Sequence, residues 1–132
     1  MDDLLFLGAE RFQNLVENVG GFASTGWVTQ LLETSKEVVR KRVQQNTLIA
    51  RRTAAGELSF PRFQFDEPNG QVLAGLQAVL LETSSWAPEE LILFLLVRYN
   101  PEHTDDTPLK MLKRGELDSV LHLISVHLEQ RP

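Results

Sequence analysis

Side chains that could hold and read a nucleic acid are concentrated in one stretch of the sequence, residues 35–62. This stretch contains seven of the thirteen Lys and Arg residues of the chain and two Glu residues, so it carries +5, whereas the whole chain of 132 residues carries −5. A basic region on an acidic chain is typical of a small domain that meets a polyanion on one face. A solvated charged face is the alternative interpretation.

The first part of this stretch has the spacing of an amphipathic helix. Three valines are predicted to form its buried side, at about 100° per residue: Val38, Val39 and Val43. On the other side, Arg40 and Gln44 are one turn apart and could read base edges in a major groove. Lys36 and Lys41 suit phosphates, although Lys41 could instead pair with Glu37. Arg42 falls beside the valines and is expected at the edge of the core.

The second part is β-like. Residues 47–52 and 58–65 are predicted strands, and Gly56 can take the positive φ that the intervening loop needs. Pro61 favours an edge strand or a bulge. Such a hairpin would place Arg51, Arg52 and Arg62 beside the phosphate backbone. A solvent-facing hairpin whose arginines only aid solubility is the alternative.

A shorter helix precedes the basic helix. It is predicted from Thr25 to about Glu33. Thr34 and Glu37 are predicted to form a capping box at the start of the basic helix. Ser35, in the first turn of that helix, is expected to be a further DNA contact. Two short helices joined by a tight turn outline a helix-turn-helix. With the hairpin, residues 27–65 resemble the winged helix-turn-helix of MerR-like and excisionase-like DNA-binding proteins.

Another predicted helix lies at the start of the chain. Residues 2–19 have mostly helical apolar spacing, and Gly20 and Gly21 end the pattern. This helix could pack on its own domain or form the contact between two protomers.

The second half of the chain is helical in outline and contains a motif. Residues 107–115 read Thr-Pro-Leu-Lys-Met-Leu-Lys-Arg-Gly, and Asp118 and Val120 follow. The motif and its flanking helices resemble the C-terminal domain of the Xre/MbcA/ParS antitoxin family. The resemblance implies an autoregulatory repressor that neutralises a toxin of the ADP-ribosyltransferase-like type. The residues expected to bind that partner are Asn100, Thr107, Pro108, Leu109, Gly115 and Arg131. The domain could also serve a stand-alone regulator as a dimerisation unit.

Catalytic and metal-binding patterns are weak in this sequence. His122 and His127 would lie about 140° apart on a helix and cannot share a metal as an i,i+4 pair would. A cation loop at residues 103–106 lacks further ligands. There is no glycine-rich phosphate loop, serine elbow or Cys–His pairing, so we expect no enzyme, metal or cofactor. No apolar run approaches a membrane span and there is no cysteine, as suits a cytoplasmic protein.

The sequence therefore predicts a mainly α protein with a small β-hairpin, consisting of a winged helix-turn-helix and a C-terminal helical bundle. Residues 1–24 would form the N-terminal helix, 25–66 the DNA-binding domain and 67–132 the antitoxin-like domain. We expect a homodimer that binds double-stranded DNA at half-sites roughly 34 Å apart or a multiple of that, and a toxin protein as the possible second partner. The alternative is a non-catalytic protein-interaction module without specific DNA binding.

Overall fold

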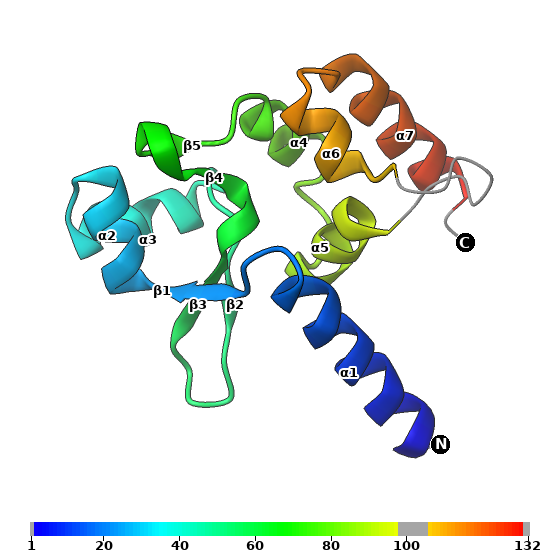
Figure 1. The fold of residues 1–132 in the computed structure, drawn as a ribbon, viewed down its shortest axis with the longest axis horizontal. Coiled ribbons are helices and arrows are strands. Elements are labelled where there is room, and N and C mark those ends of the chain that lie inside the picture. Colours follow the sequence, from blue (N-terminus) through cyan, green and yellow to red (C-terminus); the bar gives the residue numbers. More distant parts are fainter. Residues whose placement is uncertain (1, 98–105, 131–132) are drawn as a thin grey trace.

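The computed structural model describes residues 2–97 and 106–130, and in these ranges the protein is mainly helical with a small antiparallel sheet (Figure 1). The fold class expected from the sequence is confirmed. The helices are α1 (Asp2–Glu17), α2 (Thr25–Leu32), α3 (Lys36–Gln44), α4 (Leu76–Glu82), α5 (Pro88–Leu96), α6 (Pro108–Lys113) and α7 (Leu117–Glu129). The strands are β1 (Phe22–Ser24), β2 (Arg51–Arg52), β3 (Leu58–Pro61), β4 (Phe65–Asp66) and β5 (Gln71–Val72), with 3-10 turns η1 (Arg62–Gln64) and η2 (Glu67–Asn69).

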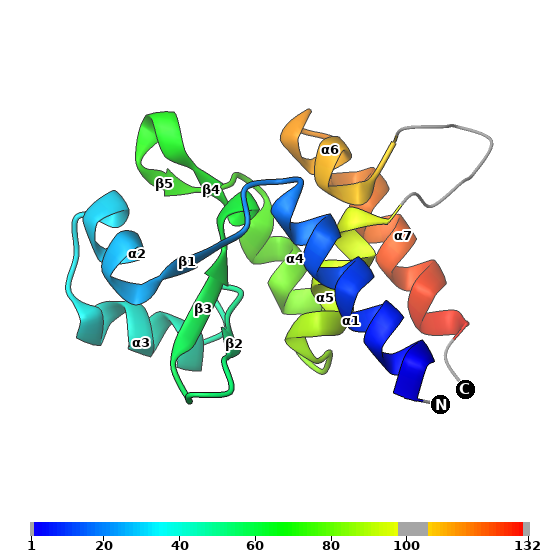
Figure 2. The same cartoon turned by 60° about the horizontal axis from the view of Figure 1, so that its bottom comes forward.

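The sheet β1-β3-β2 lies between the α2–α3 pair on one side and α1, α5, α6 and α7 on the other, in both views (Figures 1 and 2). Strand β1 was not predicted. It pairs antiparallel with β3 over Phe22–Pro61, Ala23–Phe60 and Ser24–Ser59. Residues 22–24 therefore belong to the same sheet as the β2–β3 hairpin. The winged-helix unit, residues 22–66, thus begins before residue 25.

Because β1 covers its second side, β3 is the central strand, and the edge position or bulge expected for Pro61 is wrong. The strand ends at this proline rather than at Phe65, and η1 follows it. Pro61 has no N–H to donate. The next residue, Arg62, donates its N–H to Gly21 O at 3.0 Å, so the hydrogen bonding to the segment that leads into β1 resumes directly after the proline.

The helix-turn-helix is formed by α2 and α3. Glu33 ends α2 in the left-handed conformation, with φ of 52°, and the Thr34 N–H donates to Thr29 O at 3.0 Å. Thr34 is thus still part of the α2 terminus, and the predicted Thr34–Glu37 capping box does not form. The cap of α3 is Ser35, whose hydroxyl accepts from the Val38 N–H at 3.2 Å.

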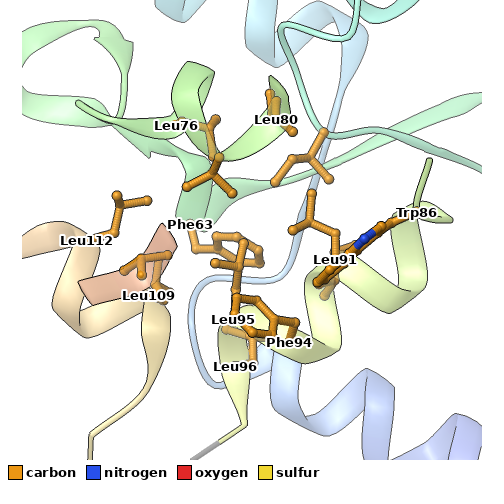
Figure 3. Packing of buried hydrophobic residues seen from close by; sticks show 14 of the residues in the cluster. Phe63, Leu76, Leu80, Trp86, Leu91, Phe94, Leu95, Leu96, Leu109 and Leu112 are labelled. Atoms are coloured by element: carbon orange, nitrogen blue, oxygen red, sulfur yellow. The ribbon is translucent and has the colours of Figure 1, made fainter. Parts of the chain in front are cut away.

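The interior divides into two apolar clusters. The smaller lies under the helix-turn-helix and the β2–β3 hairpin, which we call the wing. It consists of Val28, Val39, Leu48, Phe60 and Phe65. The larger gathers α4 to α7, with Phe63 from η1 among its members (Figure 3). Leu48 and Ile49 are neighbours in sequence, but Leu48 faces the smaller cluster and Ile49 the larger. The winged-helix unit and the helical body, which consists of α1 and α4 to α7, therefore share a continuous boundary.

Helix α1 packs on its own chain. Val16 is fully buried in the larger cluster, and the half-buried side chains of Phe12, Leu15 and Val19 pack against that cluster. Helix α1 lies beside α5 (Figure 2). Of the two possibilities that the sequence left open, the C-terminal half of α1 takes the intramolecular one.

Two polar side chains fix the backbone of the winged-helix unit, one from within the unit and one by a bond to α4. Gln64 is fully buried; its Oε1 accepts from Ile49 N–H at 2.7 Å, and its Nε2 donates to Ile49 O and Pro61 O at 2.8 and 3.0 Å. Asn46 follows the end of α3 with a φ of 57°, and its Nδ2 donates to Leu80 O of α4 at 2.9 Å. The end of α3 is thereby fixed to the helical body.

Candidate nucleic-acid interface

A hollow of about 470 Å³ separates α3 from the wing. It is lined by residues of the α2 N-terminus, of α3 and of the β2–β3 hairpin: Ser24, Thr25, Gly26, Lys36, Arg40, Val43, Gln44, Arg52, Gly56, Glu57 and Leu58. The structure thus brings together four of the eight residues predicted to contact DNA, namely Lys36, Arg40, Gln44 and Arg52. Ser24, Thr25 and Gly26 were missed because the prediction considered only the second helix of the pair.

The positive charges of α3 are available to a ligand. Lys36, Arg40 and Lys41 are exposed, and none of them forms an ion pair with any residue in the described parts of the chain. Lys41 lies outside the hollow, and its expected alternative, the pair with Glu37, is absent. Arg42 sits at the edge of the core as expected, because its Nε donates to the Thr47 hydroxyl at 3.1 Å.

The three arginines expected on the wing do not share one face. Arg52 faces the hollow, and its Nη1 donates to Gly56 O at 2.7 Å, which holds the hairpin loop. Gly56 has φ of 83°, as the loop prediction required. Arg51, the preceding residue of the strand, points to the opposite side because side chains alternate along a strand.

The predicted phosphate contact of Arg51 is therefore corrected. Its guanidinium lies 5.2 Å from the ring centre of Phe12 and 5.3 Å from that of Phe22, and its Nε is 4.0 Å from Glu89 Oε1. Arg51 joins the wing to α1 and α5.

The predicted phosphate contact of Arg62 is also corrected. Its Nη2 pairs with Glu67 Oε1 at 2.9 Å, and its guanidinium lies 4.9 Å from the ring centre of Trp27. The charge is compensated within the molecule, and its side chain does not line the hollow. Ser35, predicted as a DNA contact, is exposed beside the hollow and serves as the cap of α3.

One of the three valines predicted to be buried is on the surface. Val39 is fully buried and Val43 half-buried, but Val38 is 44% exposed. Val39 and Val43 are only about 40° apart around the helix, whereas Val38 is about 100° from Val39 and falls outside the contact with the core.

Glu57 is the acidic member of the hollow, and the sequence prediction did not include it. A carboxylate there would repel a phosphate backbone. We expect Glu57→Gln to tighten binding to all duplexes by roughly 0.5–1 kcal/mol at low salt, an effect that weakens as salt screens it. Fluorescence anisotropy at two salt concentrations measures this. Glu129→Gln, at the exposed end of α7, is the control and should leave binding unchanged.

The motif at residues 107–115 builds α6. The Thr107 hydroxyl accepts from Lys110 N–H at 3.2 Å, Pro108 opens the helix, and Gly115 follows it with φ of 82°. Pro108 and Leu109 are buried, so the prediction that they contact a partner directly is corrected. Asn100 and Arg131 lie outside the described residues. Thr107 and Gly115 remain accessible, and their observed roles are those of helix boundaries.

Arg114, inside the same motif, forms a clamp. Its guanidinium donates twice to Asp106, at 2.9 Å each, and twice to Glu116, at 2.6 and 3.1 Å. The clamp ties the start of α6 to the turn before α7. The hydrogen bonds from Arg114 lower the pKa of Glu116, and the same contacts raise the pKa of Arg114.

This clamp predicts an NMR titration. Because the pKa of Glu116 is lowered in the folded protein, its contribution to stability is present above the ordinary Glu range and disappears as pH falls through the lowered pKa. The carboxyl resonance of Glu116 should titrate below the ordinary Glu value and move back toward it in Arg114→Ala. An unchanged midpoint in that variant would show that the clamp does not form in solution.

Metal and membrane sites find no support in the described parts of the chain. Among the side chains that the structure describes, no three His, Asp or Glu are grouped to hold a metal ion. The rings of His127 and Trp86 are tilted against each other with their centres 4.6 Å apart, and His127 Nε2 lies 3.2 Å from Glu90 Oε2. The possible cation loop at 103–106 lies almost entirely outside these residues. Within them, no helix has the length and apolar character needed to cross a bilayer.

Comparison with known proteins yields a likeness of fold. No protein-family model and no curated protein matches the chain. The structure is similar to the NMR structure of Rv2175c, with a TM-score of 0.63 and 19% sequence identity over 80% of each chain. At this identity the likeness shows a shared fold, and the function has to be argued from the site.

Proposed function

We propose that the protein is a regulator that binds double-stranded DNA, with α3 in the major groove and the β2–β3 wing along the phosphate backbone. One observation carries the proposal: Lys36, Arg40 and Gln44 of α3 face the same hollow as Arg52 of the wing. An arginine and a glutamine can read base edges, and the lysine can hold phosphates.

The charge distribution supports this orientation. Residues 66–97 contain five Asp or Glu residues and no Lys or Arg, and they form much of the helical body. DNA would be repelled by this body and attracted to the α3–wing face, which favours one docking orientation. The proposed homodimer would present two such faces to two half-sites.

The test is a series of binding titrations at several salt concentrations. Three accessible cations suited to phosphates lie on or beside the hollow (Lys36, Lys41 and Arg52), and three phosphate contacts give a log–log salt slope of about −3 per copy. A dimer on two half-sites would double it. Affinity that is weak and equal for all duplexes would instead favour the protein-interaction module.

We also propose, as a second function, that the helical body binds a protein partner, as the resemblance to antitoxins implies. The supporting observation is an open groove of about 350 Å³ between α6 and α7, next to the Thr107–Gly115 motif. It is lined by Met111, Asp118, Ser119, His122 and Leu123.

Co-expression with a toxin-like protein encoded beside the gene tests the second function. We expect stable co-purification with the wild type and loss of the partner in Leu123→Glu. Leu128→Glu, at an exposed leucine of α7 that does not line the groove, is the matched control. Co-purification that survives Leu123→Glu would place the partner elsewhere.

A further inference from the structure

Val38 is an exposed aliphatic side chain on the helix proposed to read DNA. Five large hydrophobic residues are prominently exposed in the described parts of the chain, and the other four, Leu81, Leu93, Val97 and Leu128, belong to the helical body. Val38 is therefore the one that the winged-helix unit presents. Packing does not account for its type, because Val39 and Val43 make the contact between α3 and the core.

Val38 lies on the flank of α3 away from the wing: it does not line the hollow, and at about 100° per residue it is about 160° around the helix from Arg40. It is the third residue of the helix, and its N–H is already used in the Ser35 cap. Lys41 lies one turn further along and is exposed and unpaired in the described structure. With Arg52 of the wing on a phosphate at one wall of the groove and Lys41 on a phosphate at the other, α3 would be held between the walls.

The chemistry of the major groove restricts what a valine can contact there. Base edges present hydrogen-bond donors and acceptors, and the thymine C5-methyl is the apolar group among them. Valine methyls pressed on a polar edge would displace its water without replacing the hydrogen bonds. Against the thymine methyl, both partners bury apolar surface.

From these observations we propose that Val38 determines sequence specificity by packing on the C5-methyl group of a thymine in the preferred site. The proposal rests on the proposed DNA-binding function. It adds to that function the base that is recognised, the group on that base that is contacted, and the side chain that contacts it.

The experiment has two stages and uses the full chain. Selection from a random duplex library first defines a preferred site, and each thymine is then replaced singly by deoxyuridine, which lacks only the C5-methyl. For the wild type we expect about a fourfold loss of affinity at one thymine or two adjacent ones, the value of one buried methyl-sized group. Val38→Ala should bind the unmodified site about fourfold more weakly and lose nothing further at those positions.

Val97→Ala is the matched control, since Val97 is 49% exposed at the end of α5 and outside the winged-helix unit. It should respond to deoxyuridine as the wild type does. If selection yields no preferred sequence, the proposed function itself fails. If a preferred site exists but lacks a methyl-sensitive thymine, or if Val38→Ala responds to deoxyuridine as strongly as the wild type, the assignment of Val38 alone is overturned.

Discussion

Replacement of Gln64 by leucine is expected to lower the free energy of unfolding by about 3–5 kcal/mol. The side chain is fully buried and makes three hydrogen bonds, two to Ile49 and one to Pro61. Leucine fills a similar volume but leaves the Ile49 N–H, the Ile49 carbonyl and the Pro61 carbonyl without this partner. Each buried polar group left unpaired costs roughly 1–3 kcal/mol.

Thermal and urea unfolding measure the effect, and we expect the melting temperature to fall by about 10 °C or more. Gln13→Leu is the control, because the Gln13 amide makes one exposed bond of 2.8 Å to Glu17 and its loss should change stability by less than about 0.5 kcal/mol. A Gln64→Leu variant as stable as this control would mean that the link between Ile49 and η1 is not needed for the fold.

Gln64 also shows what a sequence can hide. Nothing in its neighbourhood distinguishes it from the exposed Gln44 or Gln45, since glutamine is ordinarily a surface residue. Its burial follows from the backbone of Ile49, which passes Gln64 without belonging to a strand and leaves an N–H and a carbonyl to be satisfied. Such a need arises from tertiary structure and leaves no local pattern.

The helices were predictable because each depends on a signal within one or two turns. Apolar spacing located α1, α2 and α3, and Gly20 and Gly21 marked the end of the first of them. The error in the α3 cap was a single residue, because Thr34 and Ser35 are both good capping residues and the α2 terminus had already used the Thr34 N–H.

The sheet was less predictable because its pairing is long-range. Strand β1 has three residues, and its partners in β3 are more than thirty positions away. Without β1, the hairpin looked two-stranded and its faces could not be assigned. The joint prediction for Arg51 and Arg52 had a different cause, since adjacent side chains of a strand alternate and the prediction did not apply this: one faces the helical body and the other the hollow.

The separation of these two arginines gives opposite expectations for their variants. Arg52→Ala should weaken all duplexes alike and reduce the salt slope by about one unit, because a phosphate contact is lost. Arg52→Lys keeps the charge and should preserve the slope. Arg51→Ala should leave the slope unchanged and instead reduce stability, since it removes the contacts with Phe12, Phe22 and Glu89.

The largest effect on binding is expected for Arg40→Ala. Arg40 is exposed, unpaired within the described structure and directed into the hollow with Gln44 one turn away, so its loss should not disturb folding. Affinity for the preferred site should fall by about 1–3 kcal/mol, and the preference for one base should relax. Affinity for unrelated duplexes should change little, which distinguishes a base contact from the phosphate contact of Arg52.

Competition titrations with the preferred duplex and with single-base variants of it measure both quantities. Lys113→Ala, at the exposed end of α6, removes a charge from the helical body and serves as the control for net charge. If Arg40→Ala binds every duplex as tightly as the wild type, Arg40 does not read DNA. In that case the hollow between α3 and the wing would no longer support a docking mode in which α3 occupies the major groove.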